Sequence, residues 1–99
     1  MAGPNAGDSM PLLTVIIPVY NEDRTLKELL RQVLAVPIAK QILIVDDGST
    51  DGTALLLEQL KREAPITALR HQENQGKVAA IRTALPHAIG FYTIVQDGD

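Results

Sequence analysis

Apolar residues gather in four short runs along this chain, and segments with a helical spacing of apolar residues lie between them. The runs cover residues 12–17, 42–45, 66–69 and 91–96. The second run is unbroken, which is typical of a strand buried on both faces. Pro18 follows the first run and cannot continue a central ladder, so we expect the first strand to end there. Strands that alternate with helices predict a parallel sheet.

The three intervening segments predict helices whose apolar stripes would face this sheet. We expect the first helix to stop at Pro37 and the second at Pro65, and we expect a kink or an early stop at Pro86 in the third. The apolar positions of the three helices are, in order, Leu26, Leu29, Leu30, Val33 and Leu34; Leu55, Leu56 and Leu60; and Val78, Ile81, Leu85 and Ile89.

Acidic and aromatic residues follow the ends of the predicted strands. Right-handed crossovers bring the carboxyl ends of parallel strands to one edge of the sheet. We expect a Rossmann-like three-layer α/β/α fold with strand order 3-2-1-4, and a crevice between strands one and four, where the order reverses. The groups that would meet at this edge are Tyr20, Glu22, Asp46, Asp47, Asp97 and Asp99.

This set of groups favours a phosphate ligand that carries a metal ion. The chain has neither a Walker phosphate loop nor a dinucleotide fingerprint. A cleft rich in carboxylates repels a bare diphosphate, whereas Mg²⁺ or Mn²⁺ can bridge carboxylates and phosphate oxygens. Such an ion also stabilises charge on a nucleoside diphosphate leaving group. The sequence therefore predicts a metal-dependent nucleotide site.

Composition and charge limit the classes of protein to which this chain can belong. The 99 residues fit one domain, and 45% apolar with 21% charged residues argue against disorder. A net charge of -3 provides no basic surface for nucleic acid, and the absence of cysteine excludes a disulfide framework and fits a cytoplasmic location. No apolar run approaches the ~20 residues that a membrane span needs. We expect residues 1–10 to be a flexible leader, because they are rich in Gly, Pro, Asn and Ala.

Four motifs in this order resemble those of family 2 glycosyltransferases with the GT-A fold. They are Pro-Val-Tyr-Asn-Glu at 18–22, Ile-Val-Asp-Asp-Gly-Ser-Thr-Asp-Gly-Thr at 44–53, Asn-Gln-Gly-Lys at 74–77 and Gln-Asp-Gly-Asp at 96–99. Gln75 and Gln96 make the chain most similar to the branch of dolichol-phosphate mannosyltransferase and related polyprenyl-phosphate sugar transferases. The resemblance implies that residues 11–99 are the nucleotide-sugar-binding half of a glycosyltransferase domain, cut directly after its acidic metal motif.

The resemblance also implies an activity and its residues. A sugar would move, with inversion, from a GDP- or UDP-sugar to a polyprenyl phosphate or similar acceptor. Catalytic residues on the acceptor side, and any membrane attachment, would lie in segments beyond this chain, so that the chain alone would be inactive. Asp97 and Asp99 would hold the metal ion. The implied nucleotide-sugar contacts are Pro18, Tyr20, Glu22, Val45, Asp47, Asp97, Gly98 and Asp99.

Two departures from the family pattern concern small residues: Gly98 stands where Ala is more common, and Val78 stands where Gly is common. Several other residues have plainer expected roles. We expect turn or cap hydrogen bonds from Asp46 and Asp51, solvated charges at Lys77 and Arg82, and surface positions or local hydrogen bonds for His71 and His87.

Two alternative functions remain open at this point. The acidic pair after residues 42–45 is similar to that of a receiver-type phosphoacceptor domain in signalling proteins, although there the pair normally follows the first strand. The second alternative is a non-catalytic nucleotide-binding module on the same fold. An exposed final strand could also pair with a second copy of the chain and form an oligomer.

Overall fold

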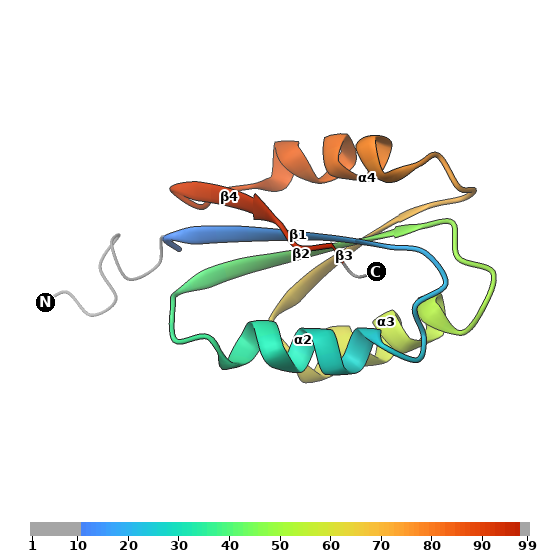
Figure 1. The fold of residues 1–99 in the computed structure, drawn as a ribbon, viewed down its shortest axis with the longest axis horizontal. Helices are drawn as coiled ribbons and strands as arrows, with labels where there is room; N and C mark the ends of the chain where they lie inside the picture. Colours follow the sequence, from blue (N-terminus) through green and yellow to red (C-terminus); the bar gives the residue numbers. More distant parts are fainter. Residues whose placement is uncertain (1–10, 98–99) are drawn as a thin grey trace, which may run out of the picture.

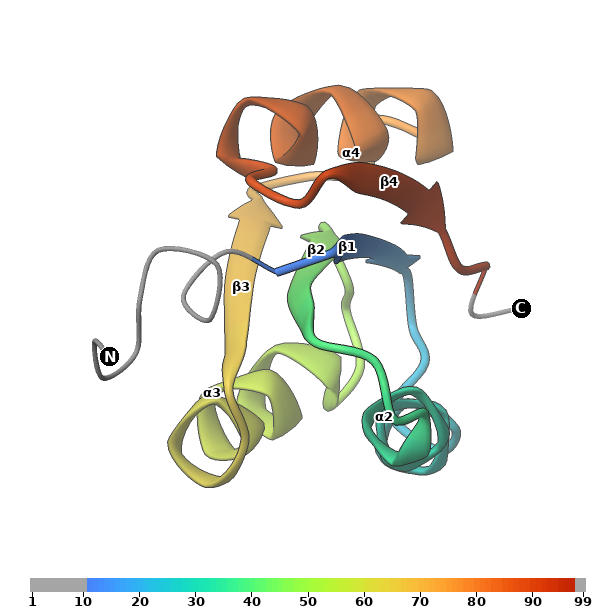
Figure 2. The ribbon, with the colours of Figure 1, turned by 90° about the vertical axis from the view of Figure 1, so that its left-hand side faces the viewer.

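The computed structural model describes residues 11–97 and confirms the predicted α/β fold. Four parallel strands form one sheet in the order β3-β2-β1-β4 (Figure 1). Helix α4 covers one face of the sheet, and α2 and α3 cover the other (Figure 2). The elements are β1 (Leu13–Val19), α2 (Leu26–Ala35), β2 (Lys40–Asp47), α3 (Thr53–Glu63), β3 (Ile66–His71), α4 (Lys77–Ala84), a 3-10 helix (Leu85–His87) and β4 (Tyr92–Val95).

Strands β1 and β2 separate two apolar cores. Successive side chains of a strand point to opposite faces, so an unbroken apolar strand supplies both cores. The larger core joins β1 and β2 to α2 and α3, and the smaller joins them to α4. The larger core includes Val15, Ile17, Ile42, Ile44, Leu26, Leu30, Leu57 and Leu60. The smaller core contains Ile16, Leu43, Val45, Ala80 and Ala84. The predicted leader, residues 1–10, lies outside the described residues.

Strand β1 continues through Pro18 to Val19, so the expectation that Pro18 ends the strand is wrong. The backbone oxygen atoms of Leu12 and Ile16 both accept hydrogen bonds from the β4 side of the sheet. Because backbone groups alternate in direction along a strand, Pro18 faces this side too. Pairing with β4 stops at Ile16, so the N–H that Pro18 lacks costs no ladder bond.

The helix stripe is confirmed in α2 except for Leu34, which is exposed, and the other two stripes are confirmed only in part. Leu26 and Leu30 are buried, whereas Leu55, a predicted core residue of α3, is 78% exposed. In α4 the buried side chains are Ala80 and Ala84 rather than the predicted larger ones. The alanine face of α4 packs on Ile16, Leu43 and Val45, and the larger residues lie on the other faces of the helix. The exposed members of the predicted third stripe are Val78, Leu85 and Ile89.

Pro86 interrupts the third helix as expected. Helix α4 ends at Ala84, and Pro86 lies within the 3-10 helix that follows it. A proline ring removes a backbone donor and crowds the preceding turn, so the α-helix cannot continue through it. Within residues 11–97, no helix combines the length and the apolar character that a membrane crossing requires.

A polar latch fixes the segment before β4 at the amino end of the sheet. The buried Thr14 hydroxyl donates to Gln41 Oε1 over 2.7 Å and accepts from the N–H of Gly90 over 2.8 Å. Gln41 Oε1 also accepts from the N–H of Ile89 at 2.9 Å, and Gln41 Nε2 donates to the carbonyl of His87 at 2.8 Å. The two side chains therefore determine where the short strand β4 joins β1.

We expect Gly90→Ala to lower the free energy of unfolding by about 1–3 kcal/mol, because the new methyl group overpacks this latch. A Cβ atom at Gly90 would lie 2.5 Å from the backbone nitrogen of Thr14 and 2.7 Å from the carbonyl carbon of Leu13. Gly52→Ala is the control, since its nearest contact is the carboxylate of Asp23, the end of a flexible side chain. Urea unfolding of both variants checks this, and equal losses would contradict it.

Candidate functional site

A cavity of about 150 Å³ opens at the carboxyl edge of the sheet. It lies beside the ends of β1 and β2, next to the start of α4, with Asp97 following β4. This is the switch point at which strand order reverses, where open α/β sheets bind their ligands. Its lining residues are Pro18, Val19, Tyr20, Asp47, Asn74, Gly76, Lys77 and Asp97, of which four were predicted for the site: Pro18, Tyr20, Asp47 and Asp97.

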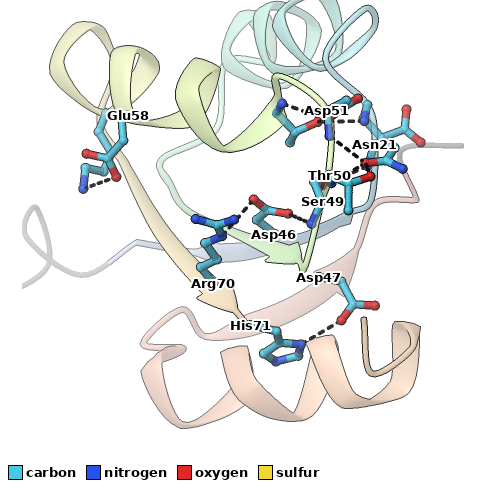
Figure 3. A network of polar contacts seen from close by, with 12 residues as sticks. Asn21, Asp46, Asp47, Ser49, Thr50, Asp51, Glu58, Arg70 and His71 are labelled. Carbon is cyan, nitrogen blue, oxygen red and sulfur yellow. Dashed lines mark hydrogen bonds and ion pairs between the residues drawn. The ribbon is translucent and has the colours of Figure 1, made fainter. Parts of the chain in front are cut away.

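Asp47 is the best-fixed carboxylate of this cavity. Its side chain is almost fully buried at the end of β2. Oδ1 accepts hydrogen bonds from the N–H of Gln75 and from Nδ1 of His71, both at 2.8 Å, and Oδ2 accepts from the N–H of Gly76 at 2.9 Å. Asp47 therefore ties the loop before α4 to the central sheet. Figure 3 shows its link to His71.

Opposing effects set the pKa of Asp47. Burial raises the pKa, but hydrogen bonds from Gln75, His71 and Gly76 stabilise the ionised carboxylate and outweigh the burial. The pKa of Asp47 therefore lies below its usual value. The group is a permanent anion near neutral pH and acts only as a hydrogen-bond acceptor.

A second polar network holds the loop after β1 against the loop after β2. The backbone of Asn21 has a φ of 53°, which Asn tolerates better than most residues. Its N–H donates to Ser49 Oγ at 2.9 Å, and its Oδ1 accepts from the N–H groups of Thr50 at 2.8 Å and Asp51 at 3.2 Å (Figure 3). The adjacent Tyr20 is therefore carried by a fixed loop, although the residue is 43% exposed.

The expected turn roles of Asp46 and Asp51 are confirmed. Asp46 Oδ1 accepts from the N–H of Ser49 at 2.9 Å. Asp51 Oδ1 accepts from the N–H and the hydroxyl of Thr53, at 2.8 and 2.6 Å, at the start of α3. Both carboxylates thus satisfy donors of the loop itself.

Two predicted contact residues have other roles in this structure. Glu22 does not line the cavity; its Oε2 accepts from the hydroxyl of Thr25 at 2.6 Å, and its carbonyl accepts from the N–H of Leu26 at 2.9 Å, where α2 begins. Val45 is fully buried in the smaller core. Ligand contacts by Glu22 and Val45 stay predictions.

Asp97 and Lys77 form an ion pair across the wall of the cavity. Lys77 was expected to be a solvated charge, and it is instead a half-exposed member of the site. Asp97 offers carboxylate oxygens, which hard divalent cations prefer, and it already holds an ammonium group, so this position suits a cation. Within residues 11–97 no cluster of three or more His, Cys, Asp or Glu side chains could hold a metal. Gly98 and Asp99, the rest of the predicted motif, lie outside the described residues.

His71 is the functional candidate that sequence reasoning missed. It was expected at the surface or in a local hydrogen bond, and it is 7% exposed with partners on both ring nitrogens. Parallel register places His71 directly beside Asp47 at the sheet edge. The signal available in the sequence was its position two residues after the third apolar run. The exposed His87 fits the expectation.

A larger cavity, of about 300 Å³, lies between α3 and β3. Its walls are mainly aliphatic, and no residue of the 150 Å³ cavity borders it. Asp46 Oδ2 is buried there and accepts no hydrogen bond within residues 11–97, although Arg70 Nε lies 3.7 Å away (Figure 3). Size alone would favour this cavity as the ligand site, but the predicted acidic and aromatic groups converge on the 150 Å³ cavity.

Fold and site together define an α/β domain with an acidic, aromatic cavity at the strand-order switch. Residues 14–99 match the model of the family described as "Glycosyl transferase family 2". The chain therefore belongs to glycosyl transferase family 2. The receiver-type alternative is not favoured.

Curated relatives include an undecaprenyl-phosphate 4-deoxy-4-formamido-L-arabinose transferase of Salmonella paratyphi A, 37% identical over 93% of this chain and 31% of the relative. A poly-beta-1,6-N-acetyl-D-glucosamine synthase of Staphylococcus aureus is 33% identical over 93% of this chain and 23% of the relative. The chain thus spans less than a third of the length of these relatives.

Solved structures agree with this family assignment. A mannosyltransferase from Pyrobaculum calidifontis, PcManGT, in complex with GDP-Man and Mn2+, superposes with a TM-score of 0.83 at 32% identity, over 91% of this chain and 28% of that one. S. aureus TarS in complex with UDP-GlcNAc superposes with a TM-score of 0.78 at 26% identity, over 88% and 26%. The expected GT-A arrangement is therefore confirmed.

We expect Asp47→Asn to lower the free energy of unfolding by about 2 kcal/mol, because the amide turns an N–H toward buried donors. The matched control Asp97→Asn replaces a half-exposed carboxylate and should change stability by less than about 0.5 kcal/mol. Chemical denaturation near neutral pH measures both.

A comparison of the wild type with Asp47→Asn also tests how the contribution of Asp47 to stability depends on pH. The pKa of Asp47 is depressed by folding, so its contribution is complete above the unfolded value of about 3.9 and is lost as the pH falls through the lower folded value. The difference in unfolding free energy between the wild type and Asp47→Asn should therefore shrink in acid. A difference that stays constant down to strongly acidic pH would contradict the assigned hydrogen bonds.

Proposed function

We propose that residues 11–99 are the nucleotide-sugar-binding part of a glycosyltransferase that moves a sugar from a nucleotide-diphosphate sugar to a polyprenyl phosphate or similar acceptor. The observation that carries the proposal is the convergence of Tyr20, Asp47 and Asp97, from three strand ends, on one cavity. The donor class is supported by structural neighbours bound to GDP-Man and UDP-GlcNAc. The acceptor class is supported by a relative named for undecaprenyl phosphate.

The nucleobase would lie between Tyr20 and Asp47. Tyr20 lines the cavity and is partly exposed, so its ring can offer a face for stacking. An ionised carboxylate has about four lone-pair positions, and the bonds from Gln75, His71 and Gly76 occupy three of those on Asp47. The remaining position, on Oδ2, can accept an N–H group of the base.

The diphosphate and a divalent cation would lie on the other side of the cavity, near Asp97. We propose Asp97 and Asp99 as ligands of Mg²⁺ or Mn²⁺, with Gly98 allowing a close approach of the backbone. The ion would act as a Lewis acid toward the leaving diphosphate. Lys77, which holds Asp97 in this structure, is placed to contact phosphate oxygens once a cation takes its position.

A polyprenyl phosphate acceptor is already ionised near neutral pH, so the proposed reaction requires no strong general base. Acceptor binding would fall to residues outside this chain, because these 99 residues correspond to less than a third of each relative. We place the reaction in the cytoplasm, with membrane attachment supplied by other segments.

Calorimetric titration of GDP and UDP, with and without Mn²⁺, tests the donor site. We expect the folded chain to bind one of them in a Mn²⁺-dependent manner, and we expect Tyr20→Ala to weaken binding about tenfold through lost stacking. Tyr92→Ala is the matched control, because Tyr92 is an exposed ring of β4 outside the cavity.

Two results would count against the proposal. Binding that is equal with and without Mn²⁺ would remove the role assigned to Asp97 and Asp99. Equal weakening by Tyr20→Ala and Tyr92→Ala would show that the nucleotide does not stack in this cavity.

A further inference from the structure

We propose that His71 is a positioning residue that, together with Thr83, orients the carboxylate of Asp47 for recognition of a base that carries a ring N–H; this inference rests on the proposed function. No motif noted in the sequence includes either His71 or Thr83. The three side chains form a single hydrogen-bonded line from α4 through the end of β3 to the end of β2.

The geometry of this line is tight and enclosed. Nδ1 of His71 lies 2.8 Å from Asp47 Oδ1, and Nε2 lies 2.7 Å from Thr83 Oγ1. The side chains of His71 and Asp47 are each only 6% exposed. Water therefore has little access to the imidazole, and its two protein partners set the orientation of the ring (Figure 3 shows the Asp47 side of the link).

The protonation pattern follows from what each partner can do. Asp47 is an ionised carboxylate and can only accept, so Nδ1 of His71 must carry a hydrogen. In a neutral imidazole Nε2 then accepts from the Thr83 hydroxyl, and in an imidazolium Nε2 donates to the same oxygen. A hydroxyl can do both, so the line survives either charge state of His71. Its role is therefore to fix a direction rather than to transfer a proton.

Fixing this direction decides which lone pair of Asp47 faces the cavity. His71 and Gln75 occupy both lone pairs of Oδ1, and Gly76 occupies one of Oδ2. If His71 gives up its bond, only the N–H groups of Gln75 and Gly76 hold the carboxylate, and the direction of its free lone pair is less tightly fixed. Guanine and uracil carry a ring N–H on their pairing edge, whereas adenine and cytosine carry a bare ring nitrogen there. A fixed acceptor thus favours GDP over ADP and UDP over CDP.

Four variants separate positioning from packing. His71→Phe keeps a ring of similar size and removes both hydrogen bonds, and His71→Asn retains a donor near the position of Nδ1. Thr83→Val removes the hydroxyl at nearly constant volume, and Thr83→Ser restores it. The measurement is the ratio of calorimetric Kd values, in Mn²⁺, for the preferred nucleotide and for its counterpart without a ring N–H.

We expect His71→Phe to reduce this selectivity about tenfold, the size of one hydrogen bond to a charged group. His71→Asn should recover most of the selectivity, Thr83→Val should lose a smaller part, and Thr83→Ser should resemble the wild type.

A second readout needs no ligand: the pKa of the Asp47 carboxyl, followed by NMR, should rise in His71→Phe because a stabilising hydrogen bond is lost. Unchanged selectivity in a folded His71→Phe protein would overturn the inference and leave the proposed function intact. If the wild type binds no nucleotide, the proposed function fails, and an unchanged Asp47 pKa would overturn the positioning role separately. If His71→Phe does not fold, equal selectivity of Thr83→Val and Thr83→Ser overturns the inference.

Discussion

The arrangement of the candidate site depends on one buried carboxylate. Asp47 ends β2 and accepts from two backbone N–H groups of the loop before α4 and from the ring of His71 at the end of β3. A buried anion is tolerated only when donors compensate for the lost hydration, so these three groups must be present together. One side chain thereby fixes a strand end, a loop and a helix start, and the same side chain faces the cavity.

Residues at the two ends of the sheet have different roles. At the amino end, Thr14 and Gln41 hold the segment that leads into β4, which determines how β4 pairs with β1. At the carboxyl end, loops that follow three strands surround the cavity, and their side chains bond to one another rather than to the core. The parallel topology requires this division, because only one edge collects all the strand ends. Substitutions at the amino end should therefore act on stability, whereas substitutions at the carboxyl end should act on ligand binding and, where they remove the bonds of Asp47, on stability as well.

Much of the fold could be predicted because it depends on patterns that one segment carries by itself. The alternation of apolar runs and helical stripes indicates a parallel sheet, Pro86 indicates the end of α4, and the acidic strand ends indicate the edge that holds the site. Features that depend on distances between segments could not be read in this way. The packing of α4 on the sheet buries Ala80 and leaves Val78 exposed, because the face that the helix turns to the sheet, not hydrophobicity alone, decides which side chains enter the core.

The register between strands explains the remaining differences between the predictions from the sequence and the structure. Pro18 stays in β1 because the ladder to β4 has already ended on the side that its nitrogen faces. His71 joins the site because β3 sets it beside Asp47, a pairing that no local pattern encodes. A histidine without neighbours at metal-ligand spacing looks unremarkable in the sequence, and only the strand pairing supplies its partners.

The central claim is that the nucleotide binds at the cavity between Tyr20, Asp47 and Asp97. The most direct test is an NMR titration of the isotopically labelled chain with GDP or UDP in the presence of Mg²⁺, followed through the backbone amide signals. The account predicts that the shifts concentrate at residues 19–21, 47, 74–77 and 97, with little change in α3 or β3 before His71. Shifts concentrated at Leu55, Glu58 and Arg70, around the larger cavity, would contradict it.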